Sequence, residues 1–162
     1  MHILERSKYL VMKPSVPLIP PPIYFLLAIA AMILLNSFFP IAHWLDYPWN
    51  YVGLVLIIAG FILTIRSAGL FRRLGTQTFP GVKATVLVNE GPFRYTRNPI
   101  YLGFIIMLVG VAVLLGSVSP FIIIPVISWI LHSQFVLREE RWMEEWFGEQ
   151  YLEYKRRTRR WL

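Results

Sequence analysis

The chain has 162 residues, which suits one domain, and it contains no cysteine, which excludes disulfides, zinc–thiolate sites and iron–sulfur clusters. Apolar residues make up 56% of the chain and charged residues only 15%, whereas about 25% of a soluble domain is charged. The mean hydropathy of +0.55 also excludes a disordered chain. A formal charge of +7 is typical of proteins that contact nucleic acid or an anionic membrane surface, and the apolar excess favours the membrane. We therefore expect a small integral membrane protein whose partners include membrane lipids and no nucleic acid.

Four apolar stretches approach the length of roughly 20 residues that a membrane-spanning helix needs. They cover about 22–39, 51–71, 100–117 and 120–137. The link between the last two is so short that they must form an antiparallel helical hairpin. The sequence therefore predicts a single domain, 1–162, that is an all-α integral membrane protein with four transmembrane helices.

The basic residues indicate how these helices are oriented. All 16 lysine and arginine residues precede the first stretch, lie between the second and third (counting Arg66 at the edge of the second), or follow the fourth. Because basic residues concentrate in cytoplasmic segments, both termini and the connection 72–98 are expected in the cytoplasm.

The connection 72–98 is too polar to cross lipid, and its aromatic content favours a folded cap. A loop of this length without regular structure is usually functional or disordered. Pro99 is suited to the first turn of the third helix, and Asn98 before it is expected to be the N-cap. The N–H groups at that helix start are available to an anionic ligand.

The segment 138–157 is expected to form a cytoplasmic amphipathic helix. Met143, Phe147, Tyr151 and Tyr154 recur on one helical face, and Gly148 marks a bend. One interpretation is a helix that lies on the inner leaflet of the membrane, with its apolar face in the lipid.

Two adjacent carboxylates, Glu139 and Glu140, follow the fourth apolar stretch, at the helix end that is unfavourable for negative charge. Either they extend into water beside their flanking arginines, or they hold a cation, which we favour. His132 lies seven residues before Glu139 and is expected on the same helix face, either as a packing residue or as a proton acceptor. The three histidines are too scattered to indicate a metal site.

Residues 91–103 read GPFRYTRNPIYLG, which resembles the GPxRYxRHPxYxG signature of the isoprenylcysteine carboxyl methyltransferase family. That family is grouped with the phospholipid N-methyltransferases. About 35 residues further on, Glu139 and Glu140 followed by FGEQYLEYK at 147–155 are similar to the family's EE…FGEEYxEYK ending. The resemblance covers residues 87–160, and the first two apolar stretches match only in being apolar.

The resemblance implies S-adenosylmethionine as cofactor, bound at the cytoplasmic face, and methyl transfer to a lipophilic, membrane-resident acceptor. The positions it carries over as cofactor-binding are Arg97, Asn98, Pro99, Tyr101, Gly103, Glu139 and Glu140. Tyr95 is a further candidate, because its ring, like that of Tyr101, is suited to packing on the adenine or against the sulfonium. Arg97 is expected to meet the cofactor carboxylate, and the two glutamates its cationic groups. Arg97 and His132 are the candidates for a catalytic role, and Arg157 and Arg160 for contact with the substrate.

Asn98 replaces the family's histidine, and an amide takes no proton at neutral pH. A carboxylate or thiolate acceptor needs no general base, whereas an amine or phenol acceptor would need His132 or a glutamate. Two other functions stay open. One is an NADPH-dependent membrane reductase of the sterol-reductase type, and the other is a non-catalytic small transporter or scaffold, although the chain shows no internal repeat.

Overall fold

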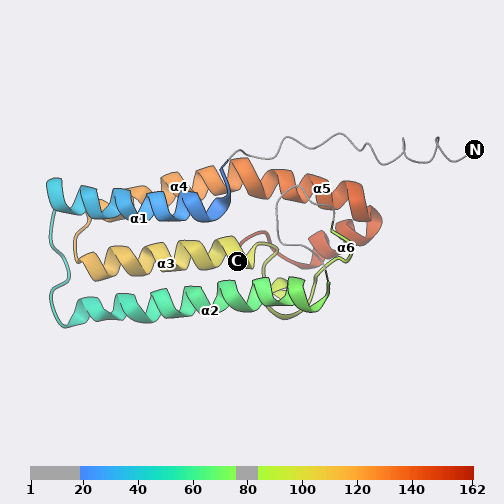
Figure 1. The fold of residues 1–162 in the computed structure, drawn as a ribbon, viewed down its shortest axis with the longest axis horizontal. Coiled ribbons are helices and arrows are strands. Elements are labelled where there is room, and N and C mark those ends of the chain that lie inside the picture. Colours follow the sequence, from blue (N-terminus) through green and yellow to red (C-terminus); the bar gives the residue numbers. More distant parts are fainter. Residues whose placement is uncertain (1–18, 76–83) are drawn as a thin grey trace, which may run out of the picture.

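The computed structural model describes residues 19–75 and 84–162, and these form a bundle of helices that run along one long axis (Figure 1). Within the described residues there is no β-strand, only two isolated bridges. The helices are α1 Pro21–Phe38, α2 Val52–Arg73, α3 Pro99–Leu115, α4 Ile123–Leu131, α5 Leu137–Phe147 and α6 Glu149–Arg157, with short helices at Trp49–Tyr51, Gly91–Arg94 and Ser119–Ile122 and a π-helical segment at His132–Val136. The predicted all-helical class is confirmed.

Three helical stretches of the described chain are long and apolar enough to cross a membrane: Pro21–Phe38, Trp49–Arg73 and Ser119–Phe147. The α3 helix is equally apolar but shorter, at 17 residues. The last stretch runs on to Phe147, well past the predicted end near residue 137. Arginine, glutamate, tryptophan and methionine all tolerate a helix, so polarity after residue 137 does not end it.

Prolines fix several helix ends. The α1 helix begins with Pro21 and Pro22, where the missing N–H groups have no intrahelical partner in any case. Pro99 opens α3 in the same way, as predicted. Asn98 occupies the N-cap position, but its side chain makes no capping hydrogen bond and is engaged elsewhere.

The α3 helix lies between α2 and the pair formed by α1 and α4 (Figure 1). Its contact with α2 depends on glycines, because the backbone of Gly110 approaches that of Gly53, and that of Gly103 approaches that of Gly60. A Cβ atom on Gly110 would lie 2.6 Å from the carbonyl oxygen of Gly53. Small residues of this kind let two membrane helices pack backbone to backbone.

The predicted helix 138–157 ends at the same residue as α6, but it differs from the structure at its start and in its middle. Through the π-helical segment, α5 continues α4 in one rod, and the chain turns at Gly148, whose φ is +52°. The α6 helix then folds back toward the start of α3 (Figure 1). Gly148 therefore marks a sharp reversal, which gives α6 a protein neighbour.

Candidate active site

A cavity of about 740 Å³ lies at the end of the bundle where α1 and α3 begin and α2 ends. Its described walls come from the start of α1, the last turns of α2, residues 84–101, and the facing sides of α5 and α6. Its polar lining is supplied by Thr64, Arg72, Arg97, Asn98, Tyr101, Glu139 and Glu140, and most of the other lining residues are apolar or aromatic. The two motifs, which are separate in the sequence, therefore meet around one cavity.

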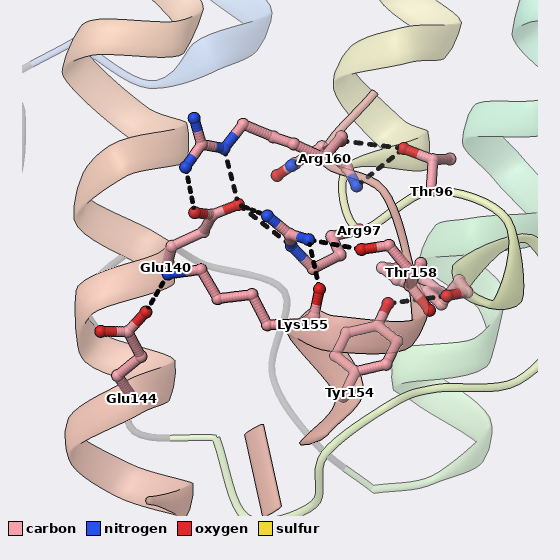
Figure 2. Close-up of polar contacts among 10 residues, drawn as sticks. Thr96, Arg97, Glu140, Glu144, Tyr154, Lys155, Thr158 and Arg160 are labelled. Atoms are coloured by element: carbon pink, nitrogen blue, oxygen red, sulfur yellow. Dashed lines mark hydrogen bonds and ion pairs between the residues drawn. The ribbon is translucent and has the colours of Figure 1, made fainter. Parts of the chain in front are cut away.

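Glu140 is the centre of an ion-pair cluster (Figure 2). Arg97 donates to its Oε1 from Nε (3.1 Å) and Nη2 (2.9 Å). Arg160 donates from Nε to Oε1 (3.0 Å) and from Nη2 to Oε2 (2.8 Å), and this bonding raises the pKa of Arg160. The side chains of Glu140 and Arg97 are each only 7% exposed. Both oxygens of Glu140 therefore bind arginines of the protein itself, and these neutralise the charge of the carboxylate.

The remaining donors of Arg97 bind the C-terminal end of α6. Its Nη1 donates to the carbonyl oxygens of Lys155 (3.2 Å) and Thr158 (Figure 2). The predicted contact of Arg97 with a cofactor carboxylate competes with these four intramolecular bonds. Arg97 thus links the segment before α3 to α5 and α6 at once.

Glu139 has a different environment from its neighbour. Its Oε1 accepts a hydrogen bond of 2.6 Å from the hydroxyl of Tyr101, in the first turn of α3. Among the described residues no Lys, Arg or His lies within ion-pair distance of it, whereas Glu140 has two arginines. Glu139 lines the cavity. Of the two carboxylates, Glu139 is therefore the one that has no ion-pair partner among the described residues and is available to a ligand.

Aromatic side chains of α5 and α6 form the opposite wall. Trp142 and Trp146 stack with ring centres 6.2 Å apart, and Tyr151 and Tyr154 face the cavity from α6. Burial raises the pKa of both tyrosines, so they stay protonated. Tyr154 accordingly donates to the carbonyl oxygen of Phe93 at 2.7 Å. This contact joins α6 to the loop before α3.

The structure brings together some of the predicted site residues and separates others. Those that line the cavity are Arg97, Asn98, Pro99, Tyr101, Glu139 and Glu140. The others lie elsewhere. Tyr95 is 76% exposed, Gly103 faces α2, Arg157 pairs with Glu153 at the exposed surface, and Arg160 reaches Glu140 from the C-terminal segment.

His132 does not lie with the glutamates. It lines a separate, open groove of about 440 Å³ between α3 and α4, with its ring 6.2 Å from that of Trp161. Its Nδ1 is buried and has no hydrogen-bond partner among the described residues. The π-helical segment begins at His132 and holds one residue more per turn than an α-helix, so the seven-residue spacing no longer places His132 and Glu139 on one face.

The resemblance implies that the C-terminal helix contributes to the site, but its aromatic side chains were not singled out from the sequence as site residues. Met143, Tyr151 and Tyr154 carry a visible signal, because they form the apolar stripe that was interpreted as a lipid contact. The last turns of α2, represented by Thr64 and Ala68, also line the cavity and carry no motif.

The fold and the cavity define an all-helical integral membrane protein with a cavity of small-molecule size at one end of its bundle. Residues 49–150 match the family model of phospholipid methyltransferases, and the chain belongs to that family.

The curated relatives point in the same direction. The chain is 32% identical over 137 residues to the protein-S-isoprenylcysteine O-methyltransferase of Schizosaccharomyces pombe, covering 76% of this chain and 57% of that protein. It is 34% identical over 117 residues to protein-S-isoprenylcysteine O-methyltransferase A of Arabidopsis thaliana, covering 69% and 56%. The chain thus spans little more than half the length of these relatives.

Among solved structures, the eukaryotic intramembrane Ras methyltransferase, an isoprenylcysteine carboxyl methyltransferase, is similar in fold. The TM-score is 0.63 at 23% sequence identity, over 85% of this chain and 50% of that one. The similarity supports the arrangement of helices described above.

Proposed function

We propose that this protein transfers a methyl group from S-adenosylmethionine to a lipophilic, membrane-resident acceptor. One observation carries the proposal: the two family motifs, at 91–103 and 139–155, line one cavity, and Glu139 in its lining has no ion-pair partner among the described residues. The names of the relatives support it, because they are protein-S-isoprenylcysteine O-methyltransferases.

The residues of the cavity fit this cofactor. Its volume of about 740 Å³ lies within the range of roughly 300–1,000 Å³ that is usual for small-molecule sites. Glu139 supplies a carboxylate for the ammonium or sulfonium group, and Tyr101 orients that carboxylate. The aromatic wall offers π faces to the adenine and to the positive charge. When bound, S-adenosylmethionine supplies an electrophilic methyl group for in-line displacement.

The chain's contribution to such a reaction is alignment and exclusion of water. Tyr101 and Glu139 hold one end of the ligand, and the free N–H groups in the first turn of α3 are suited to a carboxylate. The apolar lining from α1 and from the end of α2, including Ile65 and Ala68, is suited to the hydrophobic part of an acceptor.

The protonation chemistry favours one kind of acceptor. Asn98 takes no proton, and its amide already donates to the carbonyl oxygen of Arg160 at 3.0 Å. His132 lies in the separate groove, which leaves Glu139 as the one unpaired base in the described lining. An acceptor that is already an anion, such as a carboxylate, needs no base, and we propose that class.

We also propose the membrane topology. The α3 helix crosses the membrane as a fourth span, although it is the shortest, and the basic residues place both termini and the cavity at the cytoplasmic face. Arg6, Lys8, Lys13 and residues 76–83 of the proposed cap lie outside the described residues. The amphipathic segment 138–157 then closes the cavity on its cytoplasmic side.

Calorimetric titration of the purified, detergent-solubilised protein tests the proposal. We expect S-adenosylmethionine and its demethylated product to bind and NADPH not to bind. A screen of membrane lipids and prenylated cysteine carboxylates with labelled methyl groups then identifies the acceptor. Binding of NADPH alone would establish the reductase instead, and binding of none of the three to a folded protein would refute a nucleotide-cofactor enzyme.

Glu139→Gln is expected to weaken binding of S-adenosylmethionine by roughly tenfold or more, because it removes a charge-assisted contact with the cation. The glutamine keeps the length of the side chain and can still accept from Tyr101, so the fold should persist. Calorimetry measures the change. The matched control is Glu145→Gln, an exposed carboxylate on the same helix. Equal affinities in the wild type and in the Glu139 variant would remove Glu139 from the site.

A further inference from the structure

We infer that Arg160 is a positioning residue. Through Glu140 it holds residues 158–162, which we call the C-terminal strap, against the start of α3, and the strap keeps α6 in place as a wall of the cavity. The inference rests on the proposed function in one respect, namely that the cavity binds S-adenosylmethionine. Arg160 lies outside both family motifs, at 91–103 and 139–155.

The strap is bonded to the segment that leads into α3. Arg159 forms a parallel bridge with Thr96, and the Arg159 carbonyl oxygen accepts from the backbone N–H of Arg97 at 2.9 Å. The carbonyl oxygen of Arg160 accepts from the Thr96 hydroxyl and from the Asn98 amide, both at 3.0 Å. Figure 2 shows the contacts of Thr96 with this part of the strap. The strap therefore runs as a short extended segment beside residues 96–98 of the first family motif.

Glu140 fixes the strap from the other side. Its two oxygens accept four bonds, two from Arg97 and two from Arg160. A guanidinium that bonds one carboxylate through two donors is held in orientation as well as in distance. Glu140 and Arg97 are therefore structural partners of Arg160, and they act on a ligand through the wall that they hold.

The wall in question is α6. Tyr151 and Tyr154 face the cavity from this nine-residue helix. One end of α6 is the turn at Gly148, where no atom lies within 4 Å of a Cβ placed on the glycine. The other end continues directly into the strap. The contacts of the strap, of Arg97 with the carbonyl oxygens of Lys155 and Thr158, and of Tyr154 therefore hold the C-terminal end of α6, while the ion pair of Lys155 with Glu144 joins α6 to α5.

The first test compares binding by three variants with that of the wild type. Arg160→Gln should weaken binding of the demethylated cofactor product by roughly tenfold, because losing a hydrogen bond to a charged group typically has an effect of this size. Arg160→Lys keeps the charge and loses the paired donors, so its affinity should lie between those of Arg160→Gln and the wild type. Arg156→Gln removes the same charge from the exposed side of α6, where Arg156 pairs with Glu149, and should bind like the wild type. Circular dichroism confirms that each variant is folded.

The second test needs no ligand. The backbone amide of Arg97 is protected by the strap carbonyl of Arg159. Hydrogen exchange of this amide should be faster in Arg160→Gln than in the wild type and unchanged in Arg156→Gln. Unchanged exchange in Arg160→Gln would overturn the inference, and so would faster exchange with unaltered binding. A wild type that binds no cofactor would refute the proposed function instead, while the exchange result would still decide whether Arg160 holds the strap.

Discussion

Replacing Glu140 by alanine is expected to destabilise the protein more than any other single change at the site. Removal of one partner from a buried ion pair typically lowers the free energy of unfolding by about 3–5 kcal/mol. Here the loss leaves two guanidinium groups, those of Arg97 and Arg160, facing each other without the carboxylate that both bind. The strap and α6 should separate from the start of α3 as a result.

Thermal unfolding of the detergent-solubilised variant measures this effect. The control is Glu144→Ala, one turn further along α5. Glu144 pairs with Lys155 at 2.5 Å, but both side chains are about one-third exposed. An ion pair of that kind contributes about 0–1 kcal/mol, so the control should unfold close to the wild type. Similar unfolding temperatures for the two variants would show that the cluster around Glu140 is no more important than a surface pair.

Gly110→Ala is expected to disrupt the contact between α2 and α3. The added Cβ would lie 2.6 Å from the carbonyl oxygen of Gly53 and 2.8 Å from the backbone nitrogen of Ile57. Both neighbours are backbone atoms, so no side-chain rotation relieves the clash and the helices must separate. Overpacking of this kind lowers stability by about 1–3 kcal/mol.

The matched control for this prediction is Gly69→Ala, also at a helical glycine. Nothing lies within 4 Å of a Cβ atom placed on Gly69. Alanine favours a helix over glycine by about 0.5–1 kcal/mol, so this variant should be as stable as the wild type or slightly more stable. Thermal unfolding of the two variants side by side separates the clash from the general effect of substituting a helical glycine. A Gly110 variant as stable as the Gly69 variant would contradict the close packing.

Much of the helical architecture could be predicted because apolar runs and prolines are local signals. Pro99 opens α3 as predicted, and α1 begins at Pro21, one residue before the predicted start of the first apolar stretch. A helix was predicted on each side of residue 137, but hydropathy could not predict that the two join in one rod, because the apolar run ends there while the helix continues. The turn at Gly148 was visible as a glycine, whereas the direction of α6 after it depends on contacts with residues far away in the sequence.

The site could be predicted only in part, because local sequence signals do not show contacts between residues that are distant in the chain. The motifs identified the polar lining, but the pairing of Glu140 with Arg160 joins residues that no periodicity relates. The predicted roles of Arg97 and Glu140 as ligand contacts did not take account of their intramolecular partners, which only a folded chain supplies. The aromatic stripe of α5 and α6 was recognised as a helical face, and hydropathy alone does not tell whether such a face meets lipid or a cavity.

The π-helical segment His132–Val136 determines the angular relation between the two halves of the longest helix. Because each residue of an α-helix turns the chain by about 100°, one extra residue rotates all that follows by roughly that angle. The half before the segment follows the packing of α3, and the half after it directs Glu139 and Glu140 at the cavity. Deleting one residue here would keep the composition and hydrophobicity of the span nearly unchanged and yet point both carboxylates away from the cavity. In this helix, chain length between two positions is therefore as strict a requirement as the identity of the residues.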